Sequence, residues 1–120
     1  MTDSHRRAIA YIAGSIVSKR NSSAVYDYLY RKFFSFSITI SGSTISAYDY
    51  TDRCHISGSG ANSSFSLFHY GGRNHITLNI NQSSFSGYDY GSSKHFSGSV
   101  NGGSVSVYDY GTSKYYNYSI

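Results

Sequence analysis

Residues 84–103 read SFSGYDY-GSS-KHFSGSV-NGG, and most of the chain is built from copies of this stretch. The following unit, residues 104–120, reads SVSVYDY-GTS-KYYNYSI in the same order. The Tyr-Asp-Tyr centre recurs every twenty residues, once as Phe-His-Tyr, with a fifth copy twenty-two residues before the others. The five copies begin at Tyr26, Tyr48, Phe68, Tyr88 and Tyr108. A fixed period of this length is typical of a repeat architecture.

Each unit predicts two short strands joined by tight turns. Asn101-Gly102-Gly103 is a strong hairpin turn, because Asn and Gly accept the positive φ that a tight reversal requires. The Gly-Ser-Ser at 91–93 and the Gly-Thr-Ser at 111–113 are also typical of turns. About ten short strands with such short connections favour antiparallel neighbours.

Alternation along the strands predicts one buried face. Val105, Val107 and Asp109 share one face of their strand, whereas serine and tyrosine side chains occupy the other. The same pattern recurs in every unit. We therefore expect one apolar face, and a second face that is aromatic beside the turn after each Tyr-Asp-Tyr copy and serine-rich at the opposite end.

The composition is that of one folded β domain. The chain has 120 residues, of which 13% are charged and 18% aromatic, and this is enough for a single modest core. The aromatic content and strict alternation exclude a disordered Ser/Gly-rich chain. The lone cysteine, Cys54, cannot form an internal disulfide, so we expect a cytoplasmic protein, with peripheral membrane association as an alternative. We divide the chain into a helix, residues 1–21, and a β-repeat domain, residues 22–120, that fold as one unit.

Residues 3–20, DSHRRAIAYIAGSIVSKR, predict an amphipathic helix packed on the β domain. Apolar residues at Ile9, Ile12, Ala13 and Ile16 follow the spacing of one helical face. Asp3 or Ser4 is the expected N-cap. Gly14 costs roughly 1 kcal/mol relative to Ala, so tertiary packing must hold this helix. The apolar run is about half as long as a membrane span and is followed by Ser-Lys-Arg, so we expect neither a transmembrane segment nor a signal peptide.

The repeat period fits either antiparallel hairpins or a β-solenoid with 20-residue coils. A solenoid would stack Asp89 on Asp109 at about 4.8 Å, in a ladder of like charges, and would need polar caps at its ends. A closed barrel of five hairpins instead removes both sheet edges by pairing the first strand, about residues 23–28, with the last, 114–120. We favour the antiparallel barrel and keep the solenoid as the alternative.

Five hairpin tips follow the Tyr-Asp-Tyr copies. They are expected at Leu29–Arg31, Thr51–Arg53, Gly71–Arg73, Gly91–Ser93 and Gly111–Ser113. A barrel of about ten strands is too wide for short side chains to fill alone. The helix is the remaining apolar material, and we expect it either to plug the barrel or to lie across one mouth.

The hairpins of residues 22–120, with their YDY-turn-Lys/His-aromatic pattern, resemble those of small bacterial proteins of uncharacterised function. Their number resembles that of the shallow, symmetric barrel called the β-flower. The resemblance implies a bacterial origin and this barrel shape, and it implies no activity. A barrel around an apolar helix is also similar in outline to tubby-like domains, which bind phosphoinositide lipids, but no residue motif in this sequence carries that activity over.

No catalytic or cofactor motif is present in the sequence. The chain has no P-loop, no dinucleotide-binding fingerprint, no Gly-x-Ser-x-Gly elbow and no glutamate. His55, His75 and His95 occupy one position in successive repeats, which is more typical of a structural role than of a metal site. We therefore expect a protein that is not an enzyme and that holds neither metal nor cofactor.

Aromatic and basic residues gather beside the hairpin tips. The predicted binding residues are Tyr48, Tyr50, Arg53, Phe68, Tyr70, Arg73, Tyr88, Tyr90, Lys94, Tyr108, Tyr110, Lys114 and Tyr115. Tyrosine rings offer flat amphipathic surface to sugars or lipid head groups, and the cations attract anions. We predict a non-enzymatic binding module for lipid head groups or glycans.

Two alternatives to ligand binding remain at the level of sequence. Cross-strand tyrosine pairs can serve only to stabilise the sheet. The protein can also be a structural or assembly component whose symmetric surface contacts other protein chains. Nucleic acid is the less favoured partner, because only ten residues are basic and the formal charge is +4.

Asp27, Asp49, Asp89 and Asp109 fall on the apolar face, with His69 in the equivalent position of the third unit. A buried carboxylate is costly unless it is hydrogen-bonded. In the favoured interpretation, each carboxylate is structural and accepts backbone N–H groups of the turn that follows it. In the alternative, closure gathers these side chains into a ring, and a cation or the His69 imidazolium offsets their charge.

Overall fold

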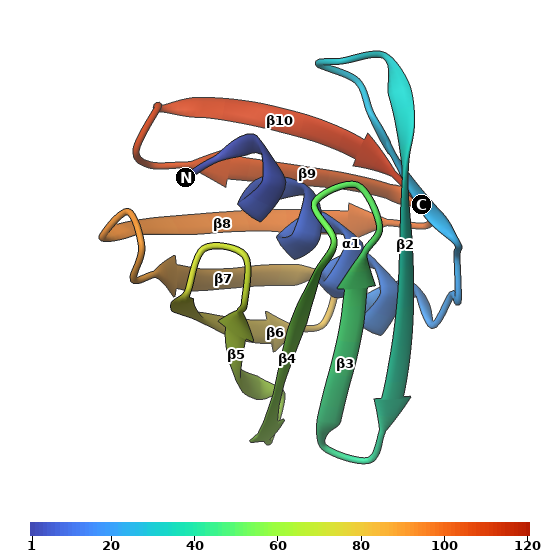
Figure 1. The fold of residues 1–120 in the computed structure, drawn as a ribbon, viewed down its shortest axis with the longest axis vertical. Helices are drawn as coiled ribbons and strands as arrows, with labels where there is room; N and C mark the ends of the chain where they lie inside the picture. Colours follow the sequence, from blue (N-terminus) through green and yellow to red (C-terminus); the bar gives the residue numbers. More distant parts are fainter.

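The computed structural model describes residues 1–120 as one helix followed by ten strands (Figure 1). The helix, α1, spans Asp3–Ser18. The strands are β1 (Ala24–Asp27), β2 (Lys32–Ser41), β3 (Thr44–Asp49), β4 (Cys54–Ala61), β5 (Ser64–His69), β6 (Asn74–Asn81), β7 (Ser84–Asp89), β8 (Lys94–Asn101), β9 (Ser104–Asp109) and β10 (Lys114–Ser119). Each Tyr-Asp-Tyr strand ends at its central residue, one position earlier than predicted, and the second tyrosine opens the turn.

The strands form a closed antiparallel barrel, as predicted. Their order around the barrel is β1-β10-β9-β8-β7-β6-β5-β4-β3-β2, and all neighbours are antiparallel. The first and last strands close the ring through the pairs Tyr26↔Ser119 and Asp27↔Tyr118. Closure leaves no free sheet edge, and the solenoid alternative is excluded because no two strands pair in parallel.

Two kinds of turn alternate along the chain and define the two mouths of the barrel. Four-residue turns follow each Tyr-Asp-Tyr copy, and two-residue turns join each hairpin to the next. We call the end with the four-residue turns the helix-entry mouth, because the N-terminal amino group lies there beside Asp109. The other end is the far mouth, where Gly102 has a φ of 60° and confirms the predicted Asn-Gly-Gly turn.

The helix plugs the barrel and does not lie across a mouth. Figure 1 shows α1 inside the ring of strands, and it contacts β1, β6, β8, β9 and β10. Inward-facing side chains of the strands, such as Phe36, Ile56 and Leu78, form one buried cluster with Ile9 and Ile12 of the helix. The apolar face predicted from alternation is therefore the inner wall of the barrel.

Burial of α1 on every side corrects the prediction of an amphipathic helix. All residues from His5 to Ser15 are buried, including the charged Arg6 and Arg7. A strand wall surrounds the helix, so no side of this segment faces solvent. The sequence of the helix is amphipathic because it contains polar residues on one side. These polar residues can nevertheless be buried, because they have partners inside the barrel.

Both ends of α1 differ slightly from the prediction. The N-cap is Thr2, and not Asp3 or Ser4, because the Thr2 hydroxyl accepts a hydrogen bond from the N–H of His5 at 3.1 Å. The helix stops two residues earlier than predicted, because Lys19 adopts the left-handed conformation, with a φ of 56°. The helix is thus confirmed in type and place, and its termini are corrected.

Glycine makes room where the helix and the wall come closest. A Cβ atom on Gly14 would lie 2.9 Å from the Val105 side chain and 2.8 Å from that of Ile120. In the wall itself, a Cβ atom on Gly87 would lie 2.5 Å from the ring of its cross-strand partner, Phe96. The helix-propensity cost of Gly14 is therefore offset by close packing of α1 on the barrel.

Candidate binding surface

Three aromatic side chains meet on the outer face of every hairpin. A central ring packs edge-on against the ring two residues later and against a ring on the next strand, with centroids 4.7–4.9 Å apart and interplanar angles of 61–83°. We call each group an aromatic triad. The five triads are Tyr26-Tyr28-Phe33, Tyr48-Tyr50-His55, Phe68-Tyr70-His75, Tyr88-Tyr90-His95 and Tyr108-Tyr110-Tyr115.

The strand period and the hairpin register together build the triads. Outward residues alternate with inward ones, so the two tyrosines on either side of Asp49 lie on the outer face. The four-residue turn then places His55 directly opposite Tyr48 on the returning strand. The second tyrosine of each copy is 53–58% exposed in all five units, so each triad presents one ring to solvent.

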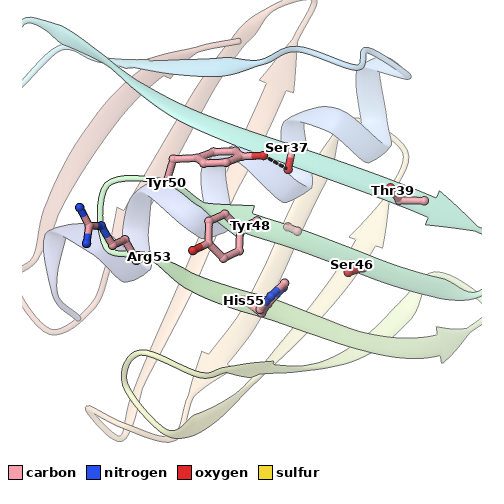
Figure 2. Close-up of a pocket in the computed structure, with 8 residues that line it drawn as sticks. Ser37, Thr39, Ser46, Tyr48, Tyr50, Arg53 and His55 are labelled. Atoms are coloured by element: carbon pink, nitrogen blue, oxygen red, sulfur yellow. Dashed lines mark hydrogen bonds between the residues drawn. The ribbon is translucent and has the colours of Figure 1, made fainter.

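The first triad-lined hollow lies across β2, β3 and β4, and we call it the main groove (Figure 2). Its volume is about 590 Å³, and it opens outward, on the side of the sheet away from α1. It is lined by Ser37, Thr39, Ser46, Ala47, Tyr48, Tyr50, Arg53 and His55. The Tyr50 hydroxyl donates to Ser37 Oγ at 3.3 Å, which ties the exposed ring to the neighbouring strand. The main groove therefore combines an aromatic wall with a floor of hydroxyl groups and one cation.

Two adjoining hollows on β6 to β10 form an extended groove. Their volumes are about 510 and 470 Å³, and both are lined by Asn79, Ser86 and Ser97. Tyr88 and His95 also line the first, and Tyr108 and Tyr115 also line the second. The extended groove has the same chemistry as the main groove: aromatic rings beside serine hydroxyl and asparagine amide groups.

The structure divides the predicted aromatic and basic set into two regions. The first aromatic residue of each copy lies on the flank of the barrel and the second opens the four-residue turn, whereas the cations lie on or beside these turns at the helix-entry mouth. We call the second region the cationic rim; its exposed members are Arg31, Lys32, Arg53, Arg73, Lys94 and Lys114. Of these, Arg53 also lines the main groove. Tyr70 and Arg73 line neither groove.

Several groove residues were not among the predicted binding residues. Ser37, Thr39 and Asn79 come from strands that precede a tyrosine strand, Ser46 comes from the tyrosine strand β3 itself, and His55 comes from the strand that follows it. Their outward positions follow from alternation, but their placement beside a given tyrosine depends on cross-strand register. The lengths of the turns determine which residues of neighbouring strands lie opposite each other, so they could have been used to predict these residues.

On the inner face, Asp27, Asp49, His69, Asp89 and Asp109 ring the helix-entry mouth, and all five are buried. Each aspartate accepts the backbone N–H two residues later, at 2.8–3.0 Å. The Nδ1 atom of His69 accepts the N–H three residues later, at 3.1 Å. The local turn interpretation is confirmed, because every unit uses its inward side chain to hold its own turn.

Side chains of the helix also pair with two of these aspartates, and the local turn interpretation did not include such pairs. Arg6 Nη1 donates to Asp109 at 2.9 Å, and Arg7 Nη1 donates to Asp27 at 3.4 Å. The N-terminal amino group also lies 3.3 Å from Asp109. Burial alone would raise the pKa of Asp109, but its hydrogen bonds from the Gly111 N–H, Arg6 and the amino group outweigh burial and lower it.

His69 is not the positively charged group that the ring alternative proposed to offset the charge of the carboxylates. Burial, reinforced by the neighbouring His5, lowers the pKa of His69 to about 4, so its ring is neutral at neutral pH. The His5 ring stacks on it with centroids 4.0 Å apart. Of the two sources of positive charge that the ring alternative named, the imidazolium is therefore excluded, and the cations present at this mouth are the two arginines of α1 and the chain's amino group.

Asp49 is the least compensated carboxylate of the inner ring. Its Oδ1 atom accepts the N–H groups of Thr51 and Asp52, but its buried Oδ2 atom has no hydrogen-bond partner. Burial raises the pKa of Asp49 for this reason, and it likewise raises the pKa of the nearby Cys54 thiol. No three His, Cys or Asp side chains of the chain are grouped so that they could hold a metal ion.

The α1 segment is too short and too polar to cross a membrane as a helix. Comparison with known proteins gives no match among family models, curated proteins or solved structures. The geometry of the two grooves and of the cationic rim is therefore the basis for a functional proposal.

Proposed function

We propose that this protein is a non-enzymatic binding module that takes neutral glycans in its flank grooves. The observation that carries the proposal is the pairing, in each groove, of aromatic rings with serine, threonine or asparagine side chains. Sugars have apolar C–H faces and a periphery of hydroxyl groups, so a site for them needs both kinds of surface. Tyrosine is well suited because it adds a hydroxyl to a flat ring at little conformational cost.

The main groove fits this class of ligand in detail. Tyr50 offers an exposed ring that packs edge-on against Tyr48 and is tied to β2 by its hydroxyl. Thr39 and Ser46 place hydroxyl groups at the opposite end of the groove, as Figure 2 shows. A sugar ring stacked on Tyr50 would have hydrogen-bond donors and acceptors within reach along β2 and β3, and these groups sit on rigid strands.

The cationic rim supports a second candidate ligand, the anionic head groups of lipids. Six basic side chains lie exposed around the helix-entry mouth, whereas Asp52 is the exposed acidic residue on these turns. Leu29 and Tyr30 on the first turn are 60% and 48% exposed, so the rim also offers some apolar surface. Such a rim suits peripheral contact with an anionic membrane surface.

A glycan array and a liposome pull-down, run in parallel, test the two candidates. We expect binding of the intact protein to neutral glycans, and weakening by about tenfold in Tyr50→Ser combined with Tyr115→Ser, because the variant loses one exposed ring per groove. Tyr70→Ser is the matched control, since Tyr70 is equally exposed and lines neither groove.

The outcomes separate the alternatives. Binding only to anionic liposomes, abolished by Lys94→Ala with Lys114→Ala, would replace the glycan proposal with the membrane one. Binding to neither would reject both ligands and favour the structural or assembly role.

A further inference from the structure

The two grooves occupy opposite arcs of the barrel. The main groove spans β2 to β4, and the extended groove spans β6 to β10. In the closed strand order, β5 separates the two grooves on one side and β1 separates them on the other. In Figure 1, β3 and β4 likewise lie on a different wall of the barrel from β8 and β9. A ligand in one groove therefore faces away from a ligand in the other.

From this arrangement we propose that one chain binds two separate glycan chains and cross-links them. The inference rests on the proposed glycan function, and it adds the number of sites and their opposite directions. The molecule measures 33 × 29 × 29 Å, so the barrel itself stands between two ligands bound on its two flanks. A short oligosaccharide in the main groove would have to cross β5 or β1 to reach the extended groove.

The barrel holds the two sites at a fixed separation. All ten strands are paired in one ring, and α1 fills its interior, so no hinge lies between the grooves. A rigid spacer that carries two outward-facing sites favours bridging between two polymer chains or two surfaces over double binding to one flexible chain. The effective strength of attachment to a glycan-coated surface then exceeds that of either groove.

The grooves also differ in length, which gives each a different preference. The main groove is a single hollow of about 590 Å³, which suits one or two sugar rings. The extended groove joins two hollows through Asn79, Ser86 and Ser97, so it can follow a longer segment of the same polymer. We expect oligosaccharide length to matter more for the extended groove than for the main groove.

Agglutination of polysaccharide-coated beads tests the proposal. Separate bead sets carry yeast mannan, chitin oligosaccharides or dextran, and turbidity reports cross-linking while labelled protein reports binding. The intact protein should bind and agglutinate at least one set. Tyr50→Ser and Tyr115→Ser should each keep binding at about half the number of sites and lose agglutination, and the double variant should bind about tenfold more weakly.

Tyr70→Ser is again the matched control. Tyr70→Ser should bind and agglutinate like the parent. Binding without agglutination, or loss of all binding in one single variant, would show a single site and overturn the inference while leaving the glycan function intact. Failure to bind any bead set would overturn the proposed function and the inference together. Light scattering of the parent and variants checks that a change of oligomeric state does not produce the result.

Discussion

Asp109 shows how a single inward carboxylate is accommodated in this barrel. Its side chain accepts the Gly111 N–H at 2.8 Å and pairs with Arg6 and the N-terminal amino group. Asp89 has the same turn contact but no cation, since its other partners are Asn74 and Ser92. Carboxylates at equivalent positions of the repeat therefore differ in whether their partners are charged or neutral.

Asp109→Asn should destabilise the protein far more than Asp89→Asn. The first change leaves the amino group without its anion and leaves Arg6 with the Asp3 carboxylate alone, and breaking such a buried pair costs roughly 3–5 kcal/mol. The second keeps an amide oxygen for Gly91 and Asn74, and Ser92 can accept from the new amide, so the cost should stay below about 1 kcal/mol. Urea unfolding of the two variants measures both values.

The same pair of variants also tests the local interpretation of the turns. Equal losses in Asp89→Asn and Asp109→Asn would mean that the cations of α1 contribute nothing. Added divalent cations should leave the melting temperatures of the parent and of Asp89→Asn unchanged. A rise in the parent that Asp89→Asn abolishes would instead reveal a metal held by the ring.

At the scale of the element, three of the two-residue turns at the far mouth have a positive φ at their first residue only, and that residue differs in type among them. Gly42 and Gly102 have a φ of 60°, and Gln82 occupies the equivalent position with a φ of 57°. Gly adopts this left-handed conformation without the steric cost that a side chain brings. Gln82→Gly should therefore raise the free energy of unfolding by about 1 kcal/mol.

Gly102→Gln is the reciprocal change and should lower the free energy of unfolding by a similar amount. No atom lies within 4 Å of the Cβ position of Gly102, so the cost would come from the backbone alone. Thermal unfolding of the two variants beside the parent checks both signs. If Gln82→Gly is destabilising, its side chain contributes more than its backbone conformation costs.

The strands, the turns and the closure of the barrel could be predicted from sequence because the same strand and turn pattern recurs in every repeat unit. Val105 and Val107 give the inner face by alternation, and Asn101-Gly102-Gly103 gives the turn. The burial of α1 on all sides could not be predicted in this way. Arg6 and Arg7 are buried because Asp109 and Asp27 pair with them and because the rings of Tyr116 and Phe34 lie against their guanidinium groups. These are contacts with distant residues, which the sequence of the helix does not contain.

The site was predicted in part. The tyrosines were identified because their repetition is visible, but the hydroxyl floor contributed by Thr39 and Ser46 depends on strand register. The sequence also placed the cations with the tyrosines as one belt. The structure separates them only in part: Arg73 and Lys94 lie at the turns and Tyr88 lies on the flank, but Arg53 lines the main groove with Tyr50.

At the scale of the whole molecule, the barrel and its helix depend on one buried core that includes titratable groups. His69 is the group whose protonation bears most directly on acid stability. Burial and the neighbouring His5 lower its pKa from 6.5 to about 4. The unfolded chain therefore binds more protons between these values, so the stability contributed above pH 6.5 is lost as the pH falls through about 4.

The loss should reach ~3 kcal/mol, as given by the difference between the two pKa values. Urea unfolding across this pH range measures it. Asn in place of His69 can still accept the N–H of Gly72 but does not titrate, so His69→Asn should show a shallower dependence on pH. An equal dependence in parent and variant would assign the acid sensitivity to other groups. Asp49 acts with the opposite sign, because burial raises its pKa and its protonation relieves an unpaired charge.

The central claim is that ligands are held by the aromatic grooves on the flank of the barrel. The most direct measurement is NMR of the protein with 13C-labelled tyrosine and histidine rings, titrated in turn with mannohexaose, chitohexaose and maltohexaose. We predict that at least one sugar shifts the ring signals of Tyr48, Tyr50 and His55 in a saturable way and leaves those of Tyr70 unchanged. No shift with any sugar, or shifts at Tyr70 equal to those at Tyr50, would contradict the account.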